Sequence, residues 1–314
     1  MIDITIQNFE TELIQASAHT PVLLDIWAPW CGPCKSLSPV LEKLERDYAG
    51  RFTLAKLNSD EQPEIAGQLS QAFGVRSIPF CVLFDQGQPV DGFVGAQPEA
   101  QIRQFLDRHV PSQEDAQAEA QAEEAEALEA EGDPEAALAK LQQAVAVAPG
   151  NDAARCDYVK LLLELKRVPQ ARMALDPIAG KAALDGRVAS LALWLQACEK
   201  APTLRNVDAL RAAIAANRRD FDARYELAQG HFAAARFTDA MDELLEIVMR
   251  DKQWNEQLAR RTYVAILDLM SKPPPKAATP EAAKGTLEVA SKSAAAPGDP
   301  LVDQYRRKLS MALF

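Results

Sequence analysis

Two cysteines separated by two residues follow an almost wholly apolar segment near the start of the chain. Val22–Trp27 has the length and composition of a buried strand, and Cys31 and Cys34 come shortly after it. The stretch from Cys31 to about Tyr48 has the pattern of a helix. Cysteines three positions apart at a helix start share one face, so their sulfur atoms can bridge with little backbone movement. The segment therefore predicts a strand–helix unit that carries a dithiol able to cycle with a disulfide.

Strand-like and helical patterns alternate through residues 1–110. After the cysteine pair come, in order, Phe52–Leu57, Glu64–Phe73, Phe80–Phe84, Val90–Val94 and Glu99–His109. Such alternation indicates βαβ units around a mixed sheet with helices on both faces. We therefore predict an α/β domain over residues 1–110.

The chemistry expected of the pair follows from its place at a helix start. Unpaired N–H groups and the helix dipole favour negative charge there, which lowers the pKa of the Cys31 thiol and makes it the expected nucleophile. Cys34, one turn further, would resolve the mixed disulfide that Cys31 forms with a client protein. Pro33 loses no intrahelical hydrogen bond in the first turn and stiffens the loop. Gly32 leaves room for a client backbone.

Asp25 is the single acid in the apolar strand segment. In a strand buried on both faces, desolvation would raise its pKa, which suits a proton acceptor for Cys34. The alternative is a core carboxylate with satisfied hydrogen bonds and no part in the chemistry.

A zinc site is the other chemistry that a Cys-x-x-Cys motif suggests. A closed site needs four ligands, but the chain has no second such motif and its three histidines are scattered. We therefore predict no metal, and no cofactor beyond the redox-active disulfide Cys31–Cys34. The other cysteines lie singly in apolar segments, where cysteine usually acts as a small hydrophobe, and we assign no role to Cys81, Cys156 and Cys198.

Charge and hydropathy exclude several classes of function. The formal net charge is −11, and residues 111–131 hold 8 acids and no base. No basic patch with interleaved aromatics is present, which argues against nucleic acid, and the negative charge opposes anionic membranes. The first residues lack a secretory pattern, and no apolar run reaches the ~18 residues of a membrane span. We predict a cytoplasmic protein, where a close cysteine pair is catalytic or metal-binding rather than structural.

A second, all-α domain is expected beyond Pro111. Residues 111–131 predict an acidic linker helix, as a solvated connector rather than a binding tail, because Ala and Leu recur at helical spacing. Over residues 132–270, small and large residues recur with a 34-residue period, which indicates helix–turn–helix repeats. Residues 271–298 form a Pro/Ala-rich insertion that we expect to be flexible or partly helical, and 299–314 a C-terminal helix. The recurring positions include Gly132, Ala137, Leu141, Ala144, Pro149, Ala171, Leu175, Ala228, Ala240, Leu244 and Ile247.

The run from Val22 to Lys35 resembles the active-site strand and helix of thioredoxin, and Gly74–Pro79 resembles its cis-proline turn. This resemblance implies a cis Ile78-Pro79 bond placed against Cys31. It also implies that Trp30, Ile78 and Pro79 contact client proteins. Phe80 stands where thioredoxins usually have threonine, so more hydrophobic client contacts are expected.

A thioredoxin-like domain followed by degenerate tetratricopeptide-like repeats is similar to the bacterial chaperedoxin family (CnoX or YbbN), and the similarity extends to the C-terminal segment Tyr305–Phe314. It implies a holdase chaperone that also protects client cysteines by thiol–disulfide exchange and passes clients to the GroEL/GroES chaperonin. The implied partners are unfolded or oxidised client proteins, this chaperonin, and a thioredoxin or glutathione reducing system. The resemblance assigns chaperonin binding to the C-terminal helix, through Tyr305, Leu309, Leu313 and Phe314.

The sequence is compatible with other functions. The C-terminal helix can instead cap the repeats, as terminal elements of repeat proteins do. The whole chain can be a protein disulfide reductase that its repeats direct to one partner, or a scaffold in which the dithiol is incidental. Protection of unrelated unfolding proteins separates a holdase from a targeted reductase, and reduction of insulin separates both from a scaffold.

Overall fold

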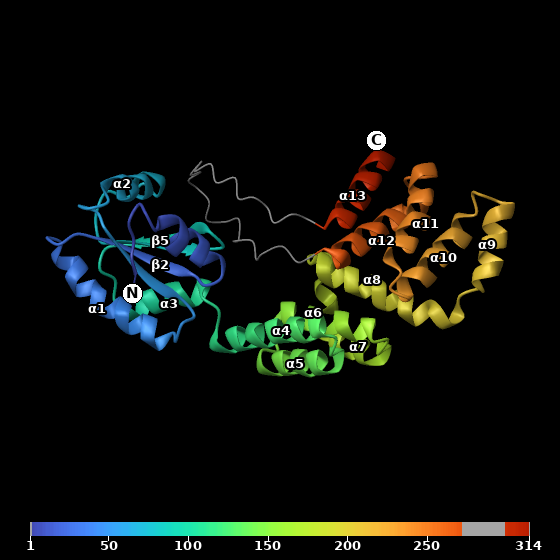
Figure 1. The fold of residues 1–314 in the computed structure, drawn as a ribbon, viewed down its shortest axis with the longest axis horizontal. Coiled ribbons are helices and arrows are strands. Elements are labelled where there is room, and N and C mark those ends of the chain that lie inside the picture. The colour runs from blue at the N-terminus through green and yellow to red at the C-terminus, as the bar shows by residue number, and fades with distance from the viewer. Residues whose placement is uncertain (1, 272–298, 314) are drawn as a thin grey trace. The chain divides into compact units, whose positions relative to one another are not determined.

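The computed structural model describes residues 2–271 and 299–313, so most of the predicted insertion at 271–298 and Phe314 lie outside the described residues. The chain divides into two compact units at Ala116 and Gln117, within the helix α4 (Gln113–Glu131). Figure 1 shows an α/β unit at the N-terminus and a helical unit after it. Over the described ranges, no helix combines the length and the hydropathy needed to cross a membrane.

The first unit contains a five-stranded mixed sheet in the order β1-β3-β2-β4-β5. β2 pairs with β3 in parallel and with β4 in antiparallel orientation, and β5 pairs antiparallel with β4. The strands are β1 (Ile2–Asp3), β2 (Val22–Trp27), β3 (Thr53–Asn58), β4 (Phe80–Asp85) and β5 (Gln88–Val94). The sheet order places β2, the strand that leads to the cysteine pair, at the centre.

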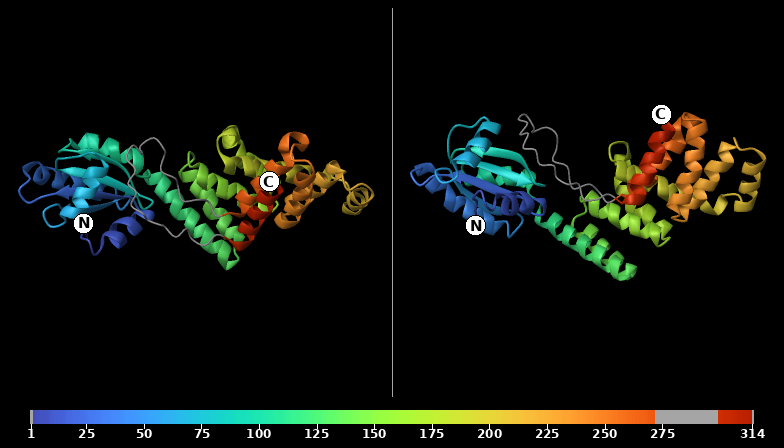
Figure 2. Two further views of the ribbon diagram at one scale, coloured as in Figure 1. Left: turned by 90° about the horizontal axis from the view of Figure 1, so that it is seen from above. Right: turned by 45° about the horizontal axis from the view of Figure 1, so that its top comes forward.

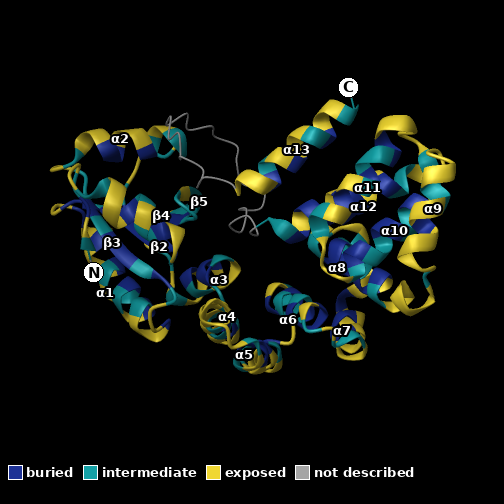
Figure 3. Ribbon diagram, turned by 45° about the vertical axis from the view of Figure 1, so that its right-hand side comes forward, coloured by how far each residue is buried: buried dark blue, intermediate teal, exposed yellow. Residues whose placement is uncertain are grey.

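Helices cover both faces of this sheet. The side chain of Leu23 packs with α1 (Gly32–Asp47) and α3 (Glu99–His109). The next residue, Leu24, points to the other face and packs with α2 (Pro63–Ala72) and the π-helical turn Phe9–Gln15. Because successive side chains of a strand alternate in direction, a strand covered on both faces is apolar throughout. β2 is accordingly dark blue, the colour of buried residues, in Figure 3.

The second unit is helical, and α5 begins at the repeat region that the sequence predicted. Asp133 and Asn151 accept hydrogen bonds from the N–H groups of Ala136 and Ala154, which caps α5 and α6 at their predicted turns. After α4 the helices are α5 (Pro134–Val147), α6 (Asp152–Glu164), α7 (Val168–Leu175), α8 (Gly186–Lys200), α9 (Val207–Ala216), α10 (Phe221–Ala233), α11 (Phe237–Arg250), α12 (Trp254–Met270) and α13 (Pro300–Leu313). The α/β fold followed by an all-α repeat region is therefore confirmed.

Small residues allow neighbouring helices of the repeat region to approach each other. Ala137, Ala171 and Ala240 are all fully buried in one continuous apolar core that includes Trp194. Each helix pair buries its apolar face only against the next pair, so this core extends through the stack. In the acidic helix α4, Ala125 belongs to the same core while the carboxylates lie outward, as a connector helix requires.

A glycine at the contact between β5 and β4 gives a test of this packing. Gly92 lies opposite Val82, and a Cβ atom there would lie 2.7 Å from the Cys81 carbonyl oxygen and 3.2 Å from the Phe80 ring. We expect Gly92→Ala to destabilise the first unit by about 1–3 kcal/mol, the usual cost of overpacking. The measurement is pulsed hydrogen exchange of β2 and β4 peptides across a urea series.

Gly67→Ala is the matched control for this substitution. Gly67 lies in α2, and a Cβ atom added there would meet no atom within 4 Å, so alanine adds only helix propensity. We expect this variant to gain up to about 1 kcal/mol. Equal loss of stability in both variants would contradict the packing account.

Candidate redox site

The cysteine pair lies where β2 ends and α1 begins. Cys31 is the N-cap of α1, and its Sγ accepts a hydrogen bond of 3.2 Å from the backbone N–H of Cys34. The two sulfur atoms are joined in a disulfide, with the Cα atoms 5.3 Å apart. Pro33 is in the first turn, where it removes no helical hydrogen bond. In the reduced protein, the free N–H groups of this turn would stabilise a thiolate on Cys31.

An apolar wall surrounds the disulfide. Cys31 and Cys34 are almost fully buried and pack with Ala28, Trp27 and Ile78. Ile78-Pro79 is a cis peptide bond, as the resemblance implied, and Ile78 brings this turn against the cysteine pair.

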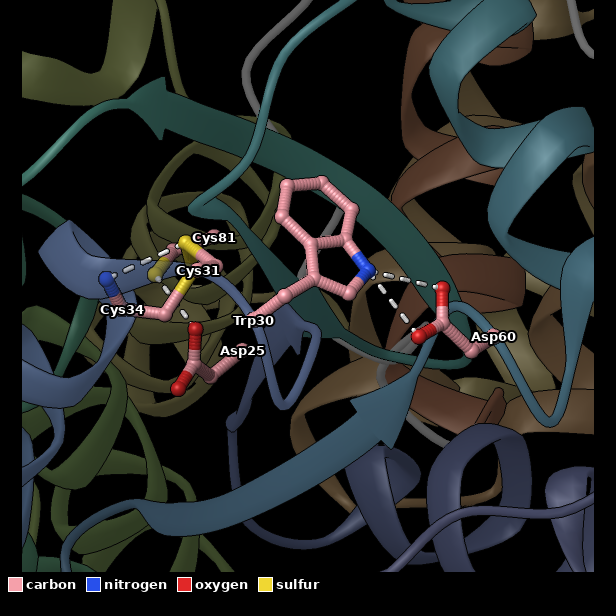
Figure 4. Close-up of a disulfide and its surroundings, with 6 residues drawn as sticks. All are labelled: Asp25, Trp30, Cys31, Cys34, Asp60 and Cys81. Atoms are coloured by element: carbon pink, nitrogen blue, oxygen red, sulfur yellow. Dashed lines mark hydrogen bonds between the residues drawn. A yellow bond between two sulfur atoms is a disulfide. The ribbon is translucent and has the colours of Figure 1, made fainter.

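Trp30 is the large apolar side chain that is accessible beside the disulfide. Its surface is 71% exposed, and its Nε1–H donates hydrogen bonds to Asp60 at 3.3 Å (Oδ1) and 3.0 Å (Oδ2). Figure 4 shows the indole turned toward Asp60, with the disulfide on its other side. The hydrogen bonds hold the ring in one orientation, so it offers a fixed apolar surface next to the reactive sulfur atoms.

Asp25 lies on the α1 face of the sheet. It is two residues from Leu23 on β2, so the two side chains share the face that α1 covers. Asp25 is fully buried, and desolvation raises the pKa of its carboxyl to about 6, although the nearby Lys56 ammonium and the Cys81 thiol lower it in part. Lys56 itself is bound to Glu42 at 3.1 Å. A carboxyl of this kind exchanges a proton near neutral pH, which is what a proton acceptor for Cys34 needs.

Cys81 is a feature of the site that the sequence did not reveal. It lies opposite Asp25 in the β2–β4 pair, fully buried, and its Sγ lies 3.8 Å from Asp25 Oδ1 as a hydrogen-bond donor. Sequence reasoning assigned it no role, because the register that brings β4 beside β2 is not visible in either segment alone.

Phe80 does not contribute to a client surface. Its side chain is on the opposite face of the sheet from Asp25, buried and 5.5 Å from the Phe73 ring. The expectation of more hydrophobic client contacts from this residue is therefore wrong. The residue after the cis proline starts β4, and its direction is set by the pleat of the strand.

The C-terminal helix α13 packs on the repeats. Figures 1 and 2 show it, in red, beside the orange helices α11 and α12. Tyr305 and Leu309 are buried in the helical core, and Leu313 packs partly against it. The Tyr305 backbone oxygen accepts a hydrogen bond of 2.9 Å from Tyr263, and Lys308 pairs with Asp242 at 3.2 Å. As the structure has it, α13 caps the repeats, and its exposed large apolar side chains are Leu301 and Met311.

Metal ligands do not gather in the described part of the chain. Within residues 2–271 and 299–313, no three His, Cys, Asp or Glu side chains lie close enough together to hold an ion. The arrangement around Cys31 and Cys34 is that of a thiol–disulfide oxidoreductase: a dithiol at a helix start, a buried acid beneath it and an apolar surface beside it.

Known proteins match this unit closely. A thioredoxin family model matches residues 1–108. Thioredoxin of Chlorobaculum thiosulfatiphilum is 46% identical over 106 residues, which cover 34% of this chain and 93% of that protein. Thioredoxin 1 of Nostoc sp. is 40% identical over 107 residues, 34% of this chain and 94% of that protein. Thioredoxin of Haemophilus influenzae is 41% identical over 105 residues, which cover 33% of this chain and 94% of that protein. Through this unit, the chain belongs to the thioredoxin family.

The helical unit matches a second kind of family. Two tetratricopeptide-repeat models match residues 128–195 and residues 200–281. The chain therefore joins a thioredoxin domain to tetratricopeptide-type repeats, an architecture suited to redox chemistry on other proteins.

The raised pKa of Asp25 gives a prediction for stability. An acid with a pKa of about 6 when folded and 3.8 when unfolded favours the folded state fully below pH 4, and this contribution is lost as pH rises through 6. Asp25→Asn has no charge to bury. We expect its free energy of unfolding to exceed that of the wild type by up to about 3 kcal/mol at pH 8. At pH 4 the free energies of unfolding of the two proteins should be similar. Urea unfolding followed by pulsed hydrogen exchange of β2 at both pH values measures this.

Asp3→Asn is the control, since Asp3 is an exposed acid at the edge of the same sheet. We expect it to stay within about 0.5 kcal/mol of wild type at both pH values. An Asp25→Asn variant with no gain at pH 8 would show that the carboxylate is buried without penalty.

Proposed function

We propose that this protein is a cytoplasmic chaperedoxin: a protein disulfide reductase joined to a helical-repeat holdase that protects client cysteines and passes clients to the GroEL/GroES chaperonin. The observation that carries the redox part is the Cys31–Cys34 pair at the start of α1, with Asp25 buried on the sheet face beneath it and Trp30 exposed beside it. The thioredoxin relatives support this part, and the tetratricopeptide-type repeats support binding of other proteins.

The redox step balances without any cofactor other than the cysteine pair. The Cys31 thiolate attacks one sulfur of a client disulfide, forms a mixed disulfide and releases a client thiolate. Asp25 accepts the proton of Cys34, whose sulfur then attacks Cys31 and restores the Cys31–Cys34 disulfide. The second client sulfur leaves as a thiolate that takes up a proton, so the client gains two electrons. A thioredoxin or glutathione reducing system supplies two electrons to regenerate the dithiol.

A groove between α8 and α12 supports the holdase part. Its lining includes apolar side chains, among them Ala189, Leu193 and Val264, and polar ones such as Gln196 and Asp268. Arg260 and Arg261 stand on its α12 side. We propose that exposed apolar segments of unfolding clients occupy this groove, with acidic flanking residues near the arginines.

Aggregation assays test the holdase. We expect the full chain to suppress thermal aggregation of a cysteine-free client, and Cys31→Ser/Cys34→Ser to do so equally while losing insulin reduction. Val264→Glu, which places a charge in the groove, should protect several-fold less and keep insulin reduction.

Val207→Glu is the matched control for the groove. Val207 and Val264 are both 39% exposed, but Val207 lies on α9 outside the groove. If the wild type does not suppress aggregation of the client, the holdase part of the proposal is wrong, and the protein is a reductase directed to one defined partner. Equal loss in both valine variants would remove the groove from the proposal.

The exposed surface of α13 is the place to test chaperonin binding. Because Tyr305 and Leu309 are buried, truncating the helix would also disturb the repeat core. Met311→Glu leaves that core intact, and we expect it to reduce co-purification with the chaperonin several-fold. Met173→Glu on α7 changes a methionine with the same 74% exposure and should leave co-purification unchanged. Unchanged co-purification of Met311→Glu would show that the exposed face of α13 is not the contact.

A further inference from the structure

The thiol of Cys81 donates a hydrogen bond to the buried carboxyl of Asp25. The β2–β4 register pairs Asp25 with Cys81, which places both side chains on the face of the sheet covered by α1. Both residues are fully buried, and the Sγ to Oδ1 distance is 3.8 Å. Figure 4 shows this hydrogen bond beside the disulfide.

The two oxygen atoms of Asp25 have different surroundings. Among the described residues, Oδ1 receives the Cys81 hydrogen bond, whereas the buried Oδ2 has no hydrogen-bond partner. From β3, Lys56 faces the carboxyl, but its ammonium is bound to Glu42 of α1. The second oxygen is therefore the one free to accept a proton, and a thiol on the first fixes how the carboxyl is turned.

We propose that Cys81 is a positioning residue of the redox site: its thiol holds Asp25 through Oδ1 and leaves Oδ2 to take the proton of Cys34. The proposal rests on the proposed reductase function. The thiol itself exchanges no electrons and forms no disulfide in this step. It donates one hydrogen bond before, during and after the transfer.

The environment of Cys81 keeps it a donor. Burial and the neighbouring Asp25 carboxylate raise the pKa of this thiol well above its usual range, so it stays protonated through the pH range of the reaction. A neutral S–H beside a carboxylate favours the charged form of the acid without adding a competing base. Cys31, at the start of α1, lies beside free N–H groups that favour a thiolate, so the two thiols have separate tasks.

Three substitutions test the role of the thiol. Cys81→Val is apolar, lacks a donor and is larger by about one methyl group. Cys81→Ser restores a donor, and Cys81→Ala serves if valine does not fold. The readouts are the pH profile of insulin reduction and the titration of the Asp25 carboxyl followed by carbon-13 NMR of the oxidised full chain. Loss of the donor should raise the midpoint for Asp25 by roughly half a pH unit, a value consistent with one weak hydrogen bond.

The Cys81 variants should differ in the titration midpoint of Asp25 and in the rate of insulin reduction. Cys81→Val moves the midpoint to higher pH and slows reduction two- to threefold near pH 6, while Cys81→Ser returns the midpoint to the wild-type value or below. Cys156→Val and Cys156→Ser, at a buried cysteine of the repeat unit, leave both readouts unchanged. A wild-type midpoint in folded Cys81→Val, or equal shifts in the valine and serine variants, would overturn the proposal.

The NMR titration separates failure of this inference from failure of the proposed function. If the wild type does not reduce insulin at all, the reductase function fails. The Asp25 midpoint still reports whether Cys81 holds the carboxyl. If insulin is reduced and the midpoint does not depend on Cys81, only the inference fails.

Discussion

Burial of β2 on both faces is the constraint on which the redox site depends. Leu23 and Leu24 pack into opposite helical layers, so neither face of the strand can shift without exposing apolar surface. The same strand carries Asp25 and leads directly into the turn that holds Cys31. The packing that stabilises the unit therefore also fixes the distance between the acid and the dithiol, and it supplies the dry surroundings that raise the pKa of the acid.

The sequence revealed those parts of the site that are local to one segment. The helix start at Cys31, the place of Pro33 and the buried acid at Asp25 each follow from the pattern of a single strand or helix. The contribution of Cys81 and the direction of Phe80 depend on which strands are neighbours and in what register. A strand's pattern gives its two faces but not its partner, so these two residues were misjudged for the same physical reason.

The C-terminal helix shows a related limit. Tyr305 and Leu309 are four residues apart, which places them on one face of a helix. An amphipathic pattern predicts that the apolar face of a helix is covered, but it does not identify the surface that covers it. In the structure α11 and α12 cover it, with Tyr263 and Asp242 adding polar contacts to Tyr305. Any external partner of α13 in this arrangement meets its outer side, where Met311 lies.

Cys31 and Cys81 have opposite chemistry because one lies at a helix start and the other within a paired strand. At Cys31 the sulfur faces the free N–H groups of a helix start, which favour a thiolate. At Cys81 the backbone is fully paired within the sheet, and the nearest charge is a carboxylate, which favours the protonated thiol. The same residue type therefore serves as the nucleophile at Cys31 and as the hydrogen-bond donor at Cys81. A helix start at Cys31 and a paired strand at Cys81, both near the buried Asp25, are enough to make one thiol the nucleophile and the other the hydrogen-bond donor.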